Sequence, residues 1–232
     1  MSYQFDPIGT IATPYPEKFA IPRQPGLVTA ARGVISLRAD CNREEILRGL
    51  DGFSHLWLVF VFHEAMREQW KPTVRPPRLG GNQRIGVFAS RSPFRPNPIG
   101  LSVVELESIE KKGSRWQIHV KGVDLLDQTP ILDIKPYIPY ADAIQDASGD
   151  YADESPATLN QISFSEAALA QLHQQAGRYP QLKELIEQVL SQQPQPAYHR
   201  DPERIYGMQL MGFNIRWRRT GDMLSVIEVE RL

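Results

Sequence analysis

GVFASRSPFRPNPIGLSVVEL, residues 86–106, joins two strand-like segments through a proline-rich loop. Apolar and β-branched residues around Val87–Phe88 and Val103–Val104 predict a strand at each end. The loop between them carries Arg91 and Arg95 among three prolines. Because proline fixes φ and restricts the residue before it, this loop has little freedom left to lose. A stiff loop with two guanidinium groups is suited to bind an anion or a polar cofactor. The simpler alternative is a connection with solvated arginines.

Further strand-like segments lie on both sides of this stretch, and few helical patterns separate them. A short helix over residues 43–50, capped by Asn42, is the exception. Parallel strands need crossover connections, usually helices, so the sequence favours a mostly antiparallel sheet closed into a β-barrel. The segments predicted as strands are 5–11, 33–37, 53–63, 101–109, 116–120 and 131–134.

The architecture changes after residue 145. Residues 146–162 are acidic and poor in large apolar side chains, which predicts a linker between a barrel domain, 1–145, and a second domain, 163–232. Ser163 and Glu166 have capping-box spacing and predict a helix start there. A second helix over 182–191 and two closing strands, 205–218 with a bulge at Gly212 and 224–229, complete the pattern. We therefore expect a small α+β domain, with alternating arginines on one strand face as a candidate RNA contact.

The charge distribution is more informative than the net charge of −1. Residues 67–95 contain seven Lys and Arg against one acid, whereas residues 140–166 contain six acids and no Lys or Arg. The first segment can attract phosphate and the second would repel it. The loop over residues 71–85 is either a nucleic-acid contact or a solvated surface loop.

Several classes of protein do not fit the sequence. Cys41 is the only cysteine, so no intrachain disulfide and no cysteine-built zinc site is expected. HEAMR, residues 63–67, lacks the second histidine of the zinc-protease pattern, and we expect no metal. The first residues lack a signal-peptide pattern, and the longest apolar run, Leu56–Phe62, is too short to span a membrane. A cytoplasmic protein without a membrane partner is expected.

Three groups of polar residues are candidate site residues, each with a structural alternative. Arg23–Gln24 lies in a loop that either lines a pocket or is plain surface. His63–Glu64 ends a predicted strand, where a histidine is often only hydrogen-bonded in place. Asp124, Asp127 and Asp133 surround a strand-to-strand corner, where acids bind ribose hydroxyls, act as a base, or cap the turn.

Four segments together resemble one known family: PRQPGLV (22–28), GFSHLWLVFVFH (52–63), RPPRLGGNQRIGVFASRSPFRPNPIGLSVVEL (75–106) and DLLDQTPILDIKPYIPYAD (124–142). They are similar to the TsaA-like family, also called TrmO, the tRNA N(6)-threonylcarbamoyladenosine methyltransferases. The resemblance covers residues 3–142. The YPQL and FNIRW segments of the tail resemble the bacterial branch that has a small C-terminal domain.

The resemblance implies an S-adenosylmethionine-dependent methyltransferase that N(6)-methylates threonylcarbamoyladenosine beside the anticodon of threonine tRNA. It also implies an N-terminal β-barrel, unlike the Rossmann methyltransferases, and a homodimer. The chain has no GxGxxG motif, which is consistent with a non-Rossmann fold. Two alternatives remain open: a non-catalytic tRNA-binding module, and a methyltransferase that acts on a small metabolite.

Carried over by motif, the resemblance also implies roles for individual residues. Asp127 is the first candidate proton acceptor, followed by Glu64 and His63. Gln128 stands where the family also accepts Gly. The RNA contacts would be Arg75, Arg78, Arg84 and Arg95. The cofactor contacts would be Arg23, Gln24, Pro25, His63, Glu64, Arg91, Leu101, Asp127, Gln128, Thr129 and Pro130.

Overall fold

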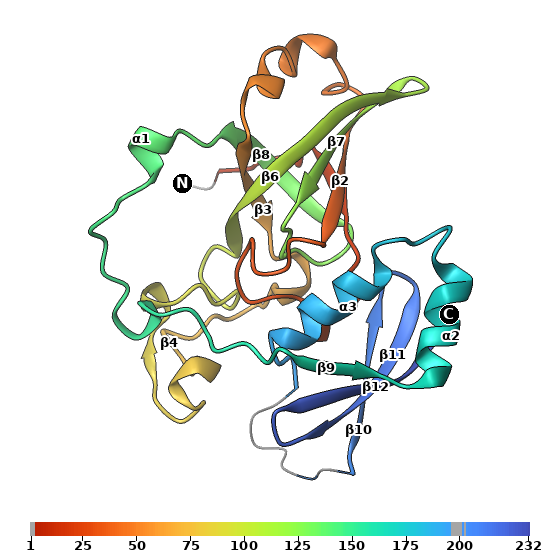
Figure 1. The fold of residues 1–232 in the computed structure, drawn as a ribbon. Helices are drawn as coiled ribbons and strands as arrows, with labels where there is room; N and C mark the ends of the chain where they lie inside the picture. Colours follow the sequence, from red (N-terminus) through yellow and green to blue (C-terminus); the bar gives the residue numbers. More distant parts are fainter. Residues whose placement is uncertain (1–2, 196–200, 202) are drawn as a thin grey trace.

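The computed structural model describes residues 3–195, 201 and 203–232. Its N-terminal part is a closed barrel of antiparallel strands in the order β1-β2-β7-β6-β3-β8, with β8 pairing back onto β1 (Figure 1). The predicted mainly β, non-Rossmann fold with an antiparallel barrel is confirmed. The barrel strands are β1 (Gly9–Ala12), β2 (Arg32–Leu37), β3 (His55–Val61), β6 (Ile99–Lys112), β7 (Arg115–Lys121) and β8 (Thr129–Pro136).

Side chains of the barrel strands alternate between the interior and the outer face, as the pleat of a strand requires. Phe60 of β3 pairs with Gly100 of β6 and is almost fully buried. A Cβ at Gly100 would lie 2.2 Å from the Phe60 ring, so only glycine leaves room for the ring at this position. The fully buried interior residues include Ile11, Ile35, Leu56, Leu58, Ile118 and Ile131.

The predicted helix over residues 43–50 is wrong. The segment forms only two 3-10 turns, η2 (Glu44–Ile46) and η3 (Leu50–Gly52), with Gly49 at a φ of 83° between them. Asn42 does not cap a helix, because its side chain bonds instead to the β6–β7 hairpin. Its Oδ1 accepts from the backbone N–H of Trp116 at 2.7 Å, and its Nδ2 donates to a neighbouring carbonyl at 2.8 Å.

Two strand predictions also need correction. Val87–Phe88 is not strand: the chain turns through a 3-10 segment, η6 (Val87–Ala89), after the short strand β5 (Ile85–Gly86). β5 pairs with β4 (Thr73–Val74), so the basic loop contains a two-stranded ribbon. The N-terminal strand begins at Gly9 rather than at residue 5, because Gly9 is the first residue that pairs with both β2 and β8.

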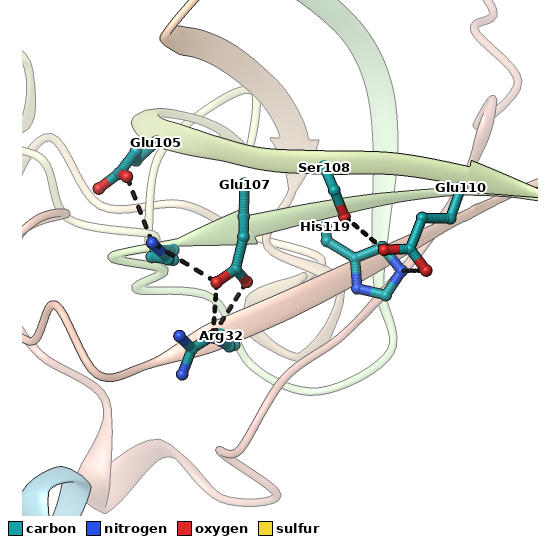
Figure 2. Close-up of polar contacts among 7 residues, drawn as sticks. Arg32, Glu105, Glu107, Ser108, Glu110 and His119 are labelled. Atoms are coloured by element: carbon teal, nitrogen blue, oxygen red, sulfur yellow. Dashed lines mark hydrogen bonds and ion pairs between the residues drawn. The ribbon is translucent and has the colours of Figure 1, made fainter. Parts of the chain in front are cut away.

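The outer face of β2, β7 and β6 carries a network of ion pairs at an irregularity in β6 (Figure 2). The register shift between Leu106 and Ser108 turns Glu107 toward β2 and β7. Both carboxylate oxygens of Glu107 lie 2.9 Å from Arg32 Nε, and Lys121 Nζ bridges Glu107 and Glu105 at 3.4 Å each. These ion pairs are partly exposed, and we infer that they help to fix the register of the strands and do not form a functional site.

The C-terminal part is a small α+β unit with a sheet in the order β10-β11-β12-β9, in which β9 runs parallel to β12. Short helix α1 precedes it in the connection from the barrel. Helix α1 spans Pro139–Asp142. The helices and strands of the C-terminal part are β9 (Gln161–Phe164), α2 (Glu166–Gln175), α3 (Leu182–Ser191), β10 (Ile205–Leu210), β11 (Phe213–Thr220) and β12 (Met223–Arg231).

Two details of this part differ from the sequence predictions. Ser165, not Ser163, caps α2: its Oγ accepts from the Ala168 N–H at 3.1 Å, while Ser163 lies in β9. Gly212 is not a bulge within one strand. It forms, with Met211, the two-residue turn of a β10–β11 hairpin, and both residues have positive φ, as such turns require.

The apolar face of α3 is confirmed as core, because the residues predicted for it, Leu182, Leu185, Ile186 and Val189, are buried. The alternation along β11 is also confirmed, with Arg216 and Arg218 on the exposed face. Both arginines are already paired, Arg216 with Glu228 at 2.9 Å and Arg218 with Glu203 at 3.4 Å.

The two parts contact each other through the segment before β2. The Gln209 N–H donates to Glu17 Oε1, and the Ala30 N–H donates to Gln188 Oε1, at 2.8 and 2.9 Å. The ring of Phe19 lies 6.1 Å from that of Trp217. Residues 13–30 are therefore held between the barrel and the C-terminal part. Within the described ranges, no helix has both the length and the apolar character needed to cross a membrane.

Candidate functional site

The strand register gathers several predicted site residues at one end of the barrel. Val61 pairs with Ile99, and Phe60 pairs with Ile131, so the end of β3 lies beside the starts of β6 and β8. The segments that follow or open these strands therefore meet at this end. They carry the residues that we call the strand-end rim: His63, Glu64, Leu101, Asp127, Gln128, Thr129 and Pro130.

The Arg91 loop is stiffened by its own hydrogen bonds as well as by its prolines. Ser90 Oγ donates to the Val87 carbonyl at 2.9 Å, and the Ser92 N–H donates back to Ser90 Oγ at 3.3 Å. Arg95 Nη1 donates to the Ser90 carbonyl at 3.2 Å. The guanidinium of Arg95 thus helps to fix the loop from which Arg91 projects.

Arg91 joins this loop to the segment that carries Arg23 and Gln24. Its Nη1 donates to Gln24 Oε1, a contact between residues far apart in the sequence. The Gly26 N–H donates to the Gly122 carbonyl at 2.9 Å and so ties the same segment to the connection after β7. Arg23, Gln24 and Arg91, which the sequence assigns to one site, are therefore together in the structure.

A large open cleft of about 1370 Å³ lies next to this pair. We call it the basic cleft, because the four residues predicted to contact RNA line it, together with Arg23, Gln24, Arg91 and two further basic residues, Arg67 and Lys71. Ala65 and Met66, which follow His63–Glu64 directly, also line it, so the basic cleft adjoins the strand-end rim. The predicted RNA contacts in its wall are Arg75, Arg78, Arg84 and Arg95.

The basic cleft also exposes large apolar side chains that the sequence reasoning missed. Phe88 is 78% exposed and Trp70 is 51% exposed, and both line the cleft. The Arg67 guanidinium lies 3.8 Å from the centre of the Phe94 ring. Aromatic residues interleaved with arginines over residues 67–95 are the sequence signal that would have indicated them. Such a surface offers stacking as well as charge.

One side of the basic cleft is formed by the acidic segment, residues 140–166. In Figure 1 this segment runs from α1 down past β4 before it enters β9. Gly149, Tyr151, Ala152 and Pro156 line the cleft. Tyr151 Oη donates to the Ala89 carbonyl at 3.0 Å, and Arg78 Nη2 donates to the Glu154 carbonyl. The negatively charged segment therefore lies against the positively charged wall.

Asp127 lies outside the basic cleft and is held in a turn. Its Oδ1 accepts from the Thr13 N–H at 2.8 Å, and its own N–H donates to the Tyr15 carbonyl at 2.8 Å. The Gln128 side chain contacts both carboxylate oxygens, at 3.3 and 3.4 Å. Gln128 has a φ of 60°, a conformation that glycine adopts without strain.

The other rim residues also lie beside the cleft rather than in its wall. Glu64 is exposed in a 3-10 turn, η4 (His63–Ala65), and its carboxylate lies 3.3 Å from Lys18 Nζ. Leu101 projects from the outer face of β6 and is 53% exposed, and Ile99, two residues earlier on the same face of the strand, is also exposed. The site therefore has two adjoining regions, a basic cleft and a rim with carboxylates and exposed apolar side chains.

Asp124 carries a largely buried carboxyl group that the sequence did not distinguish from the other two corner acids. Ser102 Oγ donates to its Oδ1 at 2.7 Å. Burial raises the pKa of Asp124 to about 6, although the Ser102 hydrogen bond and the positive charge of Arg91 act to lower it. Burial, together with the charge of Asp124, also raises the pKa of Tyr15. A raised carboxyl pKa beside a cleft is typical of functional sites.

The fold and the site define a β-barrel protein with a basic cleft, lined also by exposed aromatic side chains, beside a smaller polar rim. A family model described as the tRNA-methyltransferase O N-terminal domain matches residues 10–143, and one described as the TrmO C-terminal domain matches residues 157–232. The chain belongs to the tRNA-methyltransferase O (TrmO) family, a family of methyltransferases, as the resemblance implied.

Relatives match over the whole chain. The tRNA (adenine(37)-N6)-methyltransferase of Escherichia coli (strain K12) is 49% identical over 231 residues, which cover 99% of this chain and 98% of that protein. A Pseudomonas aeruginosa protein, RcsF, provisionally named an S-adenosylmethionine-dependent methyltransferase, is 47% identical with the same coverage of both chains. The crystal structure of TrmO from Pseudomonas aeruginosa matches with a TM-score of 0.84 at 41% identity, covering 100% of this chain and 98% of that one.

Proposed function

We propose that this protein transfers a methyl group from S-adenosylmethionine to N(6) of threonylcarbamoyladenosine beside the anticodon of threonine tRNA. The observation that carries the proposal is the basic cleft with exposed aromatic side chains, which adjoins a polar rim at the barrel end. The name of the Escherichia coli relative supports an adenosine of tRNA as the target. We further propose that the protein works as a cytoplasmic homodimer.

The residues of the strand-end rim, together with those of the Arg23–Gln24 segment and Arg91 at the adjoining edge of the basic cleft, fit S-adenosylmethionine by their chemistry. Arg91 and Arg23 offer guanidinium groups for the amino-acid carboxylate, and the carboxylates of Glu64 and Asp127 are acceptors for ribose hydroxyls or the ammonium group. Leu101, exposed on the outer face of β6, offers an apolar surface for the adenine. The remaining candidates for this contact are Gln24, Pro25, His63, Gln128, Thr129 and Pro130. When bound, the cofactor supplies an electrophilic methyl group on its sulfonium.

The chain's own contribution to the reaction is then mostly positioning. Methyl transfer is an in-line displacement, so holding the attacking nitrogen in line with the methyl group supplies much of the rate. The stiff Arg91 loop and its bond to Gln24 provide a fixed frame for that alignment. A carboxylate takes up the proton that leaves the nitrogen. Asp127 remains our first candidate, with Glu64 and His63 after it.

The basic cleft suits a single-stranded loop of tRNA. Arg75, Arg84 and Lys71 are exposed and contact phosphates in this proposal, while Phe88 and Trp70 stack on bases turned out of the loop. Reading a modified base beside the anticodon requires such a splayed base, which a loop permits at low cost.

The test of the function is incubation of the purified protein with labelled S-adenosylmethionine and tRNA, followed by mass spectrometry of the nucleosides. The tRNA comes from cells with and without the threonylcarbamoyl modification. Label that appears only on the modified adenosine of threonine tRNA supports the proposal. Cofactor binding without label on any tRNA favours a small metabolite as substrate. Binding of tRNA without cofactor binding favours a non-catalytic RNA-binding module.

The role of Asp127 is tested by Asp127→Asn, which keeps an oxygen acceptor for the Thr13 N–H. We expect lower turnover at saturating cofactor with little change in cofactor affinity, because the Asn oxygen still accepts a hydrogen bond from the cofactor, whereas the proton acceptor is lost. Turnover equal to that of the unaltered protein would remove Asp127 as the base.

A further inference from the structure

Residues 13–30 connect β1 to β2 and contact two carboxylates of the strand-end rim. The Thr13 N–H donates to Asp127 Oδ1 at 2.8 Å. Lys18 Nζ donates to the Glu64 carbonyl at 2.9 Å and lies 3.3 Å from the carboxylate of the same residue. We call residues 13–30 the site connector. Its conformation affects where both of these candidate proton acceptors lie.

The site connector also contacts the Arg91 guanidinium. Gln24 Oε1 accepts from Arg91 Nη1, and Arg23 and Gln24 both line the basic cleft. The Gly26 N–H donates to the Gly122 carbonyl at 2.9 Å and ties the connector to the turn after β7. The connector therefore meets the site at several points along its length.

Little within the site connector fixes its own conformation. All of residues 13–30 are described, and the single turn η1 (Lys18–Ala20) is the only helix or strand among them. A segment without a hydrogen-bonded ladder depends on tertiary contacts for its local stability. A crevice of about 270 Å³ lies between residues 18–23 and the C-terminal end of α3, so packing against this helix is incomplete there. The contacts on either side of the crevice therefore carry more weight.

The β10–β11 hairpin of the C-terminal part holds the first half of the site connector. Glu17 Oε1 accepts from the Gln209 N–H at 2.8 Å. The Pro14 carbonyl accepts from the Met211 N–H at the same distance. Gln209 lies in β10 and Met211 in the turn that follows it, so one hairpin bonds the connector at two points.

Helix α3 holds the other end of the site connector, which runs beside it in Figure 1. Gln188 Oε1 accepts from the Ala30 N–H at 2.9 Å, and the Thr29 hydroxyl lies 3.3 Å from the same oxygen. Gln188 Nε2 donates to Glu184 Oε1 at 3.1 Å, one turn earlier in the helix, which orients the amide. A side chain of the C-terminal part thus satisfies a backbone donor of the connector.

We propose that the C-terminal part holds the site connector in the conformation that binds the cofactor, with Glu17 and Gln188 as positioning residues. The inference rests on the proposed cofactor site. Neither residue lines the basic cleft, and each acts through the backbone to which it bonds. The alternative is that these bonds only join two parts of the fold and leave the cofactor site unaffected.

The proposal predicts that losing these bonds opens the connector more often. An intramolecular hydrogen bond changes such an equilibrium by about three- to tenfold. When the connector is displaced in more molecules, cofactor binding has to restore its position, and the apparent affinity falls with the fraction that is competent to bind. Loss of the Glu17 and Gln188 side chains should therefore weaken cofactor binding as well as loosen the connector.

Hydrogen exchange of the full chain without cofactor measures this opening directly. The amide of Gly26 is the reporter, because it bonds to Gly122 and to neither positioning residue. Its exchange should be about three- to tenfold faster in Gln188→Ala. Gln171→Ala is the matched control, because Gln171 Oε1 in α2 accepts from the Val229 N–H at 2.8 Å within the C-terminal part. This control should leave the exchange of Gly26 unchanged.

Calorimetric titration with S-adenosylmethionine measures the consequence for the site. Glu17→Ala combined with Gln188→Ala should bind the cofactor about tenfold more weakly than Gln171→Ala does. Urea unfolding of both proteins separates this effect from a general loss of stability. Glu17→Gln keeps an oxygen that accepts from the Gln209 N–H, so it should bind the cofactor as the unaltered protein does.

The outcomes separate this inference from the proposed function. Unchanged exchange at Gly26 in Gln188→Ala overturns the inference, and so does faster exchange with cofactor affinity equal to that of Gln171→Ala. Equal weakening by Glu17→Ala and Glu17→Gln also contradicts it, because the second variant keeps the bond. If exchange is faster in Gln188→Ala and even the unaltered protein binds no S-adenosylmethionine, the C-terminal part does hold the connector, and it is the proposed function that fails.

Discussion

Replacing Asp124 with Asn should make the protein more stable at neutral pH. Asn has nearly the same shape and keeps an oxygen that accepts from Ser102 Oγ. What the substitution removes is the charge that burial disfavours. The rise of the pKa from its usual 3.8 to about 6 corresponds, at 1.36 kcal/mol per pH unit, to about 3 kcal/mol.

The direction of the expected change in the free energy of unfolding follows from how it depends on pH. Because the folded-state pKa is raised, the folded protein holds the proton more tightly than the unfolded chain does. The contribution of Asp124 to stability is therefore fully present below pH 3.8 and is lost as the pH rises through about 6. Asp124→Asn should gain up to about 3 kcal/mol over the unaltered protein at pH 8, and the gain should approach zero near pH 4.

Urea unfolding of both proteins at pH 4, 6 and 8, followed by tryptophan fluorescence, measures this difference. A gain that grows with pH would show that the charge of Asp124 is held in the fold at the expense of stability. A loss of stability at pH 8 would refute the reasoning, because it would mean that the Arg91 attraction outweighs the cost of burial.

Three further predictions concern the cleft and the barrel. Arg75→Gln combined with Arg84→Gln should lower tRNA affinity and reduce the slope of log affinity against log salt by about 0.7 to 0.9 per lost phosphate contact, whereas Arg115→Gln at the hairpin tip should leave the slope unchanged. Replacing Asp146, Asp150 and Asp153 by Asn should raise tRNA affinity at low salt, since the acidic segment lies against the cleft wall, and an unchanged affinity would contradict this. Gly100→Ala should destabilise the barrel by about 1–3 kcal/mol in urea unfolding, because its Cβ would overlap the Phe60 ring, whereas Gly52→Ala, with open space around it, should not.

The fold was predictable where periodicity and connection length determine it. The strand pattern and the lack of crossover helices were enough for an antiparallel barrel, and the apolar stripe of α3 was enough to place that helix in the core. The errors lie where tertiary hydrogen bonds outweigh local signals. Asn42 looked like a helix cap and instead bonds to the β6–β7 hairpin, and Ser163 has capping spacing but lies in β9, where it pairs with Ser225 of β12. Local spacing cannot reveal a partner that is distant in the sequence.

The same difference between local and distant signals decides which site residues the sequence could predict. Arg91 and the basic residues of 67–95 were visible because one short segment contains them all, and its stiff loop keeps them on one wall. Asp124 was visible only as one of three acids near a turn, because its distinction is burial, and burial depends on strands β6 and β7 that come together only in the fold. Asp127 has the better motif, yet its carboxylate is the one that caps a turn. Motif position identifies the neighbourhood of a site, whereas the protonation state of each acid within it depends on which one the barrel removes from water.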